Sequence, residues 1–134
     1  MEKVRIMKTK VQEVPREIMT SLNSGDLLFI DSSHVVKCGS DVKYLIFDIL
    51  PRLTSGVFVH FHDVFFPFEY PSEWLTDGRY WNEDYFLRAF LSFNSEWNVY
   101  FFNSYISSAF HEYMQEYFPL CLKNNGGSLY LQRK

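Results

Sequence analysis

The stretch GVFVHFHDVFFPFEYP, residues 56–71, decides how the rest of the chain is interpreted. It begins as an almost unbroken apolar run, places His60, His62 and Asp63 within four positions, and opens into a loop of Phe, Tyr and Pro. A short apolar run after a turn is typical of a parallel strand covered on both faces. Ligand sites in open α/β sheets lie beyond the carboxyl ends of such strands. The stretch therefore predicts a central strand over residues 57–61 with polar chemistry at its end.

The run DLLFID at residues 26–31 has the same apolar character and predicts a second strand of this kind. Between the two runs, Ser40 precedes an amphipathic segment that Pro51 closes, which predicts a helix with Ser40 as its N-cap. Strands that alternate with amphipathic helices predict an α/β fold with a mainly parallel sheet. The expected strands are residues 4–11, 26–31, 57–61, 96–103 and 128–132, and the expected helices are 15–23, 40–50, 82–93 and 109–117.

The composition fits one soluble domain over residues 1–134. Hydrophobic residues at 47% and charged residues at 22% are ordinary for a globular protein, but 14 Phe and 9 Tyr predict an aromatic core or interface. A net charge of −3 argues against nucleic-acid binding. The two cysteines form no CxxC pair and are expected to be free thiols. We expect a cytoplasmic chain, because no apolar leader and no membrane-spanning run occur in the sequence.

Polar side chains follow both central strands. Asp31 and His34 come after the first, and His62 and Asp63 after the second, so we expect them to meet at one edge of the sheet. Two carboxylates with imidazoles suit a divalent metal ion such as Mg²⁺ or Mn²⁺, and a histidine alone suits a general base. The alternative is structural, with Asp31 capping its loop and the histidines bonded to backbone. For His60 we favour the structural role, because it lies within the strand and its side chain points to the face opposite Phe61.

The sequence gives little support for other kinds of binding or catalytic site. No glycine pair forms a G-x-G loop between a strand and a helix, which argues against a complete dinucleotide or phosphate loop in this sequence. Ser32 and Ser33 lack a nucleophile-elbow pattern, and a hydrolase that uses a metal at the sheet edge is a distant possibility. The aromatic loop FFPFEYPSEW at residues 65–74 is interpreted either as a lid over a substrate or as a loop packed by its own rings.

Four segments carry a resemblance to a known family. The blocks that contain FIDSSH and VHFHDVFFPFEYP are its most specific parts. The chain resembles the C-terminal half of class I S-adenosylmethionine-dependent methyltransferases, in the branch called methyltransferase family 24. The segments are VQEVP at residues 11–15, GDLLFIDSSHVVKCGSDVKYLIFDILPRLTSGVFVHFHDVFFPFEYPSEW at 25–74, RYWNEDYFLRAFLSFN at 79–94 and GGSLYLQRK at 126–134.

The resemblance implies a three-layer Rossmann-like methyltransferase sheet, truncated at its N-terminal side and mainly parallel with an antiparallel last strand. The strand order of that fold is 3-2-1-4-5-7-6, and this chain would begin at strand three. By its position in the fold, the resemblance assigns Gln12, Glu13 and Asp31 to the cofactor, Asp31, His62 and Asp63 to catalysis, and Asp31 with Asp63 to a possible divalent metal. The glycine-rich cofactor loop would lie upstream of Met1.

The implied activity is methyl transfer to a hydroxyl of a small acceptor, a sugar or a secondary metabolite. The cofactor is S-adenosylmethionine, which this chain is expected to bind weakly or not at all. The alternative is an inactive remnant that self-associates or binds a partner such as the missing N-terminal half; neither nucleic acid nor membrane is expected. Without strand one, residues 27–30 would present a bare edge. We expect residues 4–11 to occupy that place, and two chains to form a homodimer.

Overall fold

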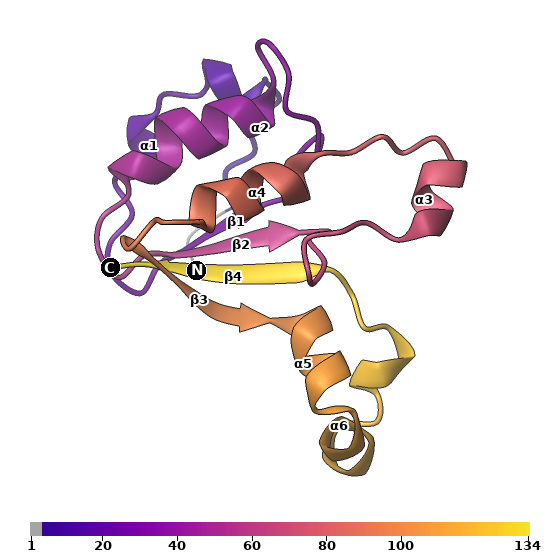
Figure 1. Ribbon diagram of the computed structural model, residues 1–134. Coiled ribbons are helices and arrows are strands. Elements are labelled where there is room, and N and C mark those ends of the chain that lie inside the picture. Colours follow the sequence, from indigo (N-terminus) through magenta and orange to yellow (C-terminus); the bar gives the residue numbers. More distant parts are fainter. Residues whose placement is uncertain (1–3) are drawn as a thin grey trace.

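The computed structural model describes residues 4–134 and contains one four-stranded sheet in the order β1-β2-β4-β3 (Figure 1). β1 and β2 pair in parallel, whereas β4 is antiparallel to both of its neighbours. β1, β2 and β3 therefore run in one direction and β4 runs against them. This is the 4-5-7-6 part of the expected strand order, so the truncated Rossmann-like α/β class is confirmed. The strands are β1 (Leu27–Ile30), β2 (Phe58–His62), β3 (Trp97–Phe102) and β4 (Ser128–Arg133).

The helices are distributed unevenly around the sheet. Helices α1, α2 and α4 lie over one face, whereas α5 and α6 project from the end of β3 on the other side (Figure 1). After α2 the chain continues as a π-helix at Leu45–Ile49 and a 3-10 helix at Leu50–Arg52. The helices are α1 (Glu17–Thr20), α2 (Asp41–Tyr44), α3 (Ser72–Thr76), α4 (Glu83–Leu91), α5 (Asn103–Ala109) and α6 (His111–Tyr117), with short 3-10 turns at Val11–Glu13 and Cys121–Lys123. None of the helices in residues 4–134 has the length and apolar character needed to cross a membrane.

Local sequence explains why the covering helix starts where it does. The Ser40 hydroxyl accepts a hydrogen bond from the Lys43 backbone N–H at 3.2 Å, which confirms the predicted N-cap. Asp41 in the first turn stabilises the positive end of the helix. The apolar side of the helix then lies on the sheet, with Ile46 and Ile49 buried. Each such side chain contributes roughly 1.5–3 kcal/mol when it is fully buried.

The hydrophobic core lies between the sheet and this helical layer. In β2, Val59 and Phe61 point into the core, and Leu129 and Leu131 of β4 lie beside them. Leu87 of α4 closes the core from above. The strand alternation that buries these residues turns the intervening ones to the opposite face, because successive side chains of a strand point to opposite sides.

Much of that opposite face is aromatic, and within residues 4–134 no helical layer covers it. We call it the aromatic sheet face. Its rings touch across three strands: Phe29 contacts His60 edge-on with centroids 4.7 Å apart, and His60 stacks on Tyr130 at 4.3 Å. The face comprises Phe29, Phe58, His60, Tyr100, Phe101 and Tyr130.

The expected first strand is wrong. Residues 4–10 form no strand, and Val4 and Ile6 are 88% and 77% exposed. Val11 and Val14 instead pack against the hydrophobic core beside the helical layer, which holds the segment away from the sheet. The outer edge of β1 consequently has no strand partner within residues 4–134, so the expected strand replacement is also wrong. The helix expected over residues 109–117 is divided at Phe110 into α5 and α6.

Gly56 provides a test of the turn that enters β2. Its φ is +85°, its N–H donates to the Arg133 carbonyl at 2.7 Å, and a Cβ built there would lie 2.1 Å from the Ser24 hydroxyl oxygen and 3.2 Å from the Ser24 Cα. We expect Gly56→Ala to lower the free energy of unfolding by about 2–3 kcal/mol, because backbone strain and a steric clash add. Urea unfolding measures this loss.

Gly39→Ala is the matched control, since Gly39 also has a positive φ, of +73°, but its Cβ would meet nothing within 4 Å. It should cost only the backbone strain of about 1–2 kcal/mol. Equal losses in the two variants would contradict the role given to the contact with Ser24.

Candidate functional site

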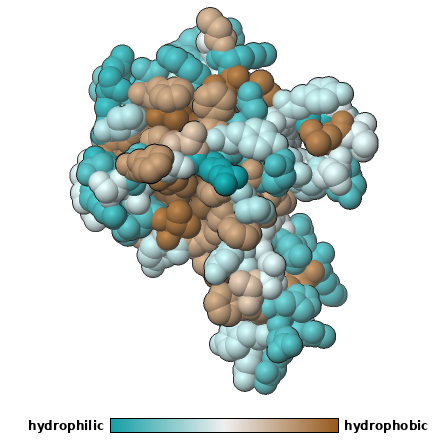
Figure 2. All heavy atoms as spheres, viewed as in Figure 1, coloured by the Kyte–Doolittle hydropathy of each residue, from teal (hydrophilic) through white to brown (hydrophobic). Residues whose placement is uncertain are grey.

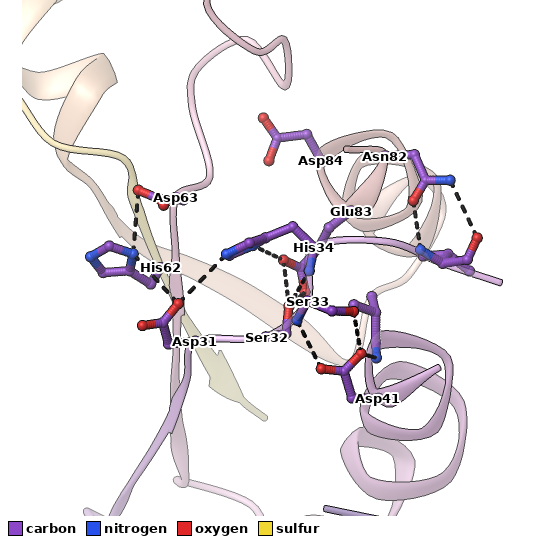
Figure 3. A network of polar contacts seen from close by, with 12 residues as sticks. Asp31, Ser32, Ser33, His34, Asp41, His62, Asp63, Asn82, Glu83 and Asp84 are labelled. Atoms are coloured by element: carbon purple, nitrogen blue, oxygen red, sulfur yellow. Dashed lines mark hydrogen bonds and ion pairs between the residues drawn. The ribbon is translucent and has the colours of Figure 1, made fainter. Parts of the chain in front are cut away.

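Three of the predicted site residues meet at the carboxyl ends of β1 and β2. The parallel register pairs Ile30 with Phe61, so Asp31 and His62 follow on neighbouring strands. The Asp31 Oδ1 lies 3.9 Å from the His62 Nδ1, and the Asp63 Oδ1 lies 3.3 Å from the same nitrogen (Figure 3). We call this group, Asp31, His62 and Asp63, the rim cluster.

The His62 ring is oriented by the two carboxylates. Its Nδ1 faces both of them and is shielded from solvent, although neither contact has hydrogen-bond geometry. The other ring nitrogen, Nε2, is turned away from the carboxylates (Figure 3), and the side chain is 43% exposed. Carboxylates beside Nδ1 favour the tautomer that carries its proton there, which leaves Nε2 as a proton acceptor.

His34 connects the rim cluster to α4. Its Nδ1 donates to the Glu83 Oε2 at 2.8 Å, and its Nε2 lies 3.5 Å from the Asp31 Oδ1. The ring also stacks on Trp81 with centroids 4.1 Å apart. Burial alone would lower the His34 pKa, but the bond to Glu83 and the charges of Glu83, Asp63 and Asp31 raise it overall. The two carboxylates thus favour the protonated form of His34.

The start of α4 holds the loop that follows β1. Glu83 is buried and accepts the Ser32 hydroxyl as well as His34, while the backbone N–H groups of Asn82 and Glu83 donate to the His34 carbonyl. Asn82 occupies the N-cap position of α4, but its side chain does not bond to the helix. Its oxygen instead accepts the Val36 N–H at 2.6 Å. Two backbone N–H groups at the start of α4 are thus satisfied by a loop far away in sequence.

Two of the residues at this edge adopt a left-handed backbone. The φ angles of His34 and Asp63 are +56° and +57°, which is uncommon for residues other than glycine. The Asp63 N–H donates to the Gly127 carbonyl at 2.7 Å, which anchors the turn. Strained backbone of this kind concentrates at functional sites. Here the turns lie directly after β1 and β2, where they set the directions of the site side chains.

Asp84 lies behind the site in an apolar environment. It is fully buried, and burial raises its pKa to about 7. One carboxylate oxygen accepts the Phe65 N–H at 3.2 Å, whereas the other has no partner. The Asp84 N–H donates to the Tyr70 oxygen at 3.2 Å, and burial with the neighbouring Asp84 charge raises the pKa of Tyr70. Asp84 therefore fixes both ends of the loop between β2 and α3.

The aromatic loop is packed by its own rings. Trp74 contacts Phe65 edge-on at 5.2 Å and Trp81 at 5.1 Å between centroids, and Tyr70 stacks on it at 6.2 Å. Of the two interpretations of this loop, a lid over a substrate or a loop packed by its own rings, the structure shows the second. Through Trp81 the packed loop also supports His34.

Two of the three residues assigned to the cofactor lie beside two adjoining hollows. Gln12 donates to the Gly39 carbonyl at 2.9 Å and lines an open groove of about 540 Å³. Asp31 lines a smaller hollow of about 170 Å³, which shares Val11 and Asp41 with the groove. Glu13 lines neither of them, and its carboxylate accepts the Thr9 hydroxyl instead.

The remaining candidates lie away from this edge. His60 is buried on the aromatic sheet face and its Nε2 has no hydrogen-bond partner, so it does not bond to backbone through that nitrogen. Cys38 and Cys121 are free and exposed, as expected. No group of three His, Cys, Asp or Glu side chains in residues 4–134 has an arrangement that would hold a metal ion. The two rim carboxylates face imidazole nitrogens instead.

Sequence reasoning missed Glu83 and Trp81 as parts of the site. An acidic residue in a first turn is commonly explained by the positive end of its helix, so Glu83 alone gives no sign of a role in the site. The signal that could have drawn attention to it is the pair of acidic residues, Glu83 and Asp84, in an otherwise aromatic segment. Buried carboxylates need partners, and His34 is the partner that Glu83 finds.

Comparison with known proteins gives one match. A family model described as a methyltransferase domain matches residues 2–64, just under half of the chain. The matched segment includes Gln12, Asp31 and His34 and ends immediately after Asp63, so it contains the whole rim cluster. No curated protein and no solved structure matches the chain significantly.

The buried Asp84 carboxyl makes stability depend on pH. Its pKa rises from 3.8 in the unfolded chain to about 7 in the folded one, so the folded state binds the proton more tightly. The stability that protonation provides is complete below about pH 4 and is lost as the pH rises through about 7, a loss on the order of 4 kcal/mol. We expect Asp84→Asn to be more stable than the unaltered chain at pH 8 and to flatten its pH dependence between pH 4 and 7.

Thermal unfolding at several pH values measures this effect. Asp77→Asn is the control, because Asp77 is exposed and its replacement should leave the profile unchanged. A steep decrease of stability between pH 4 and 7 that persists in Asp84→Asn would show that another group causes it.

Proposed function

We propose, from the premise that residues 2–64 belong to a methyltransferase domain, that the rim cluster is the acceptor side of an S-adenosylmethionine-dependent O-methyltransferase. The observation that carries the proposal is His62, whose Nδ1 faces two carboxylates while Nε2 is turned away from them at the end of a central strand. The acceptor would be a hydroxyl of a small molecule, a sugar or a secondary metabolite.

The chain's own residues would move one proton. The cofactor, when bound, supplies an electrophilic methyl group on a sulfonium. His62 accepts the acceptor's hydroxyl proton at Nε2, so that the oxygen becomes a better nucleophile. The negative charges of Asp31 and Asp63 stabilise the imidazolium that results. A positioned general base of this kind contributes roughly 10²–10⁴-fold to the rate.

His34 and Glu83 would act by positioning. The Glu83–His34 pair is buried, and its outer nitrogen faces Asp31 at 3.5 Å. Asp31 itself is more than half exposed, so without this contact its carboxylate would be free to adopt other rotamers. The pair thus holds one of the two carboxylates that orient His62.

The residues present fit part of a cofactor site. The Asp31 carboxylate and the Gln12 amide oxygen are acceptors beside adjoining hollows, and acceptors suit the cationic sulfonium and the N–H groups of S-adenosylmethionine. Glu13 is a weaker candidate because it lines neither hollow. A metal held by Asp31 and Asp63 does not fit, since within residues 4–134 no group of three His, Cys, Asp or Glu side chains has an arrangement that would hold one.

A second function has its own support. The aromatic sheet face is uncovered in the chain that the structure describes. This feature favours a self-associating module. Binding of the cofactor and turnover distinguish this function from the first.

We expect this chain to bind S-adenosylmethionine weakly, with a dissociation constant well above the low micromolar range. The physical reason is the absent glycine-rich loop, since each backbone hydrogen bond that it would provide contributes roughly 0.5–1.5 kcal/mol. Isothermal titration calorimetry with the purified chain measures the constant. A value in the low micromolar range would contradict the expectation and show that the two hollows suffice.

His62→Gln tests the proposed base directly. At millimolar S-adenosylmethionine and with a panel of sugars, catechols and other hydroxyl compounds, release of S-adenosylhomocysteine should decrease about 100-fold in the variant, because glutamine keeps a polar side chain but does not accept the proton. His111→Gln is the matched control, since His111 is exposed on α6 and outside the rim cluster. Equal rates for His62→Gln and the unaltered chain would refute the role of His62, and no turnover in the unaltered chain would favour the self-associating module.

A further inference from the structure

The aromatic sheet face is too apolar to remain in contact with water. Phe29 at 55% and Tyr100 at 65% are among its exposed rings, and the Nε2 of His60 lies among them without a partner. Burial, with the charge of His62, lowers the pKa of His60, so this ring is neutral at physiological pH. None of the six side chains of the face therefore carries a charge. Contiguous apolar surface of this size marks an interaction site.

A second uncovered apolar surface belongs to the α5–α6 arm, which we define as residues 103–123. The arm projects from the end of β3 (Figure 1), and α6 buries none of its residues. Its inner side forms a groove of about 440 Å³ whose exposed lining is apolar. The groove is lined by Phe101, Ile106, Phe110, Tyr113, Met114, Phe118 and Cys121.

The two surfaces are continuous. Phe101 belongs to the aromatic sheet face through its contact with Tyr130, and it also lines the groove of the arm. Figure 2 shows apolar side chains in the angle between the main body and the arm. On α6 the apolar side is formed by Tyr113, Met114 and Tyr117, and the charged residues Glu112 and Glu116 follow a different line along the helix. The interior of the angle is thus apolar along both of its sides.

We propose that the chain forms a homodimer in which the α5–α6 arm of each protomer covers the aromatic sheet face of its partner. A two-fold axis requires that each surface find its complement on an identical chain. This chain carries both complements, an unpacked arm and an uncovered face. Because the six side chains that define the face are uncharged, they add no electrostatic repulsion where two identical copies meet.

The area is sufficient for a stable dimer. Seven aromatic side chains of the two surfaces are about half exposed: Phe29, Tyr100, Phe101, Phe110, Tyr113, Tyr117 and Phe118. Since a fully buried aromatic side chain removes roughly 150–250 Å² from water, covering these rings would bury roughly 500–900 Å² per protomer. A standard protein interface buries about 800 Å² per partner. A small ligand would leave most of this surface exposed.

A single charged side chain introduced into either surface should prevent dimerisation. We expect the unaltered chain to be a dimer at tens of micromolar in size-exclusion chromatography with light scattering, and Phe29→Glu on the face and Tyr113→Glu on the arm to be monomeric. Tyr80→Glu is the matched control, because Tyr80 is a 76% exposed aromatic outside both surfaces, and it should remain dimeric. Circular dichroism establishes that each variant is folded. A monomeric unaltered chain would overturn the proposal.

Mixing the two monomeric variants tests the exchange of arms. A heterodimer of Phe29→Glu with Tyr113→Glu contains one pair in which an unaltered arm meets an unaltered face. The mixture should therefore dimerise at a concentration several-fold above the one that the unaltered chain needs. At that concentration each variant alone should stay monomeric. If Tyr113→Glu alone remains dimeric, the faces meet each other without the arms and the proposal is wrong. The proposal is independent of cofactor binding, so a failed methyl transfer leaves it intact.

Discussion

The parallel register between β1 and β2 is the constraint on which both the core and the site depend. It pairs Ile30 with Phe61 and so places Asp31 beside His62 at the same edge of the sheet. The same register turns Val59 and Phe61 into the core under the helices. A slip by one residue would exchange the two faces of the strand, exposing Phe61 and removing His62 from the carboxylates. Burial of one face thus fixes the chemistry at the strand ends.

The buried carboxylates at the start of α4 hold the loops that follow β1 and β2. Glu83 is removed from water, which is costly unless the charge is paired, and it is paired with His34 and Ser32. Asp84, one residue later, has a backbone donor on one oxygen and none on the other. Of these two carboxylates, it is therefore the one whose protonation affects the stability of the fold. One helix end therefore contains a satisfied carboxylate that positions the site and an incompletely satisfied one that braces the loop behind it.

The sequence predicts the parts of this fold that local pattern determines. Residues 26–31 and 57–61 are apolar runs between turn signals, and Ser40 is a cap before an amphipathic segment, so β1, β2 and α2 are found where they are expected. The meeting of Asp31 with His62 follows from parallel strands. The first strand could not be rejected from pattern, because Val11 and Val14 suit an edge strand as well as they suit a contact with the core. The pairing of Glu83 with His34 joins residues 49 positions apart, and no local rule predicts it.

The outer edge of β1 has a further consequence, for pairing between copies of the chain. An unpaired strand offers its backbone groups to any chain that can align with them. This edge is only four residues long, and acidic residues, Asp26 and Asp31, stand at its two ends. If two copies aligned antiparallel along it, each Asp26 would approach the Asp31 of the other copy, and the like charges would repel. Asp31 would then act as a gatekeeper against edge-to-edge pairing, in addition to its place in the rim cluster.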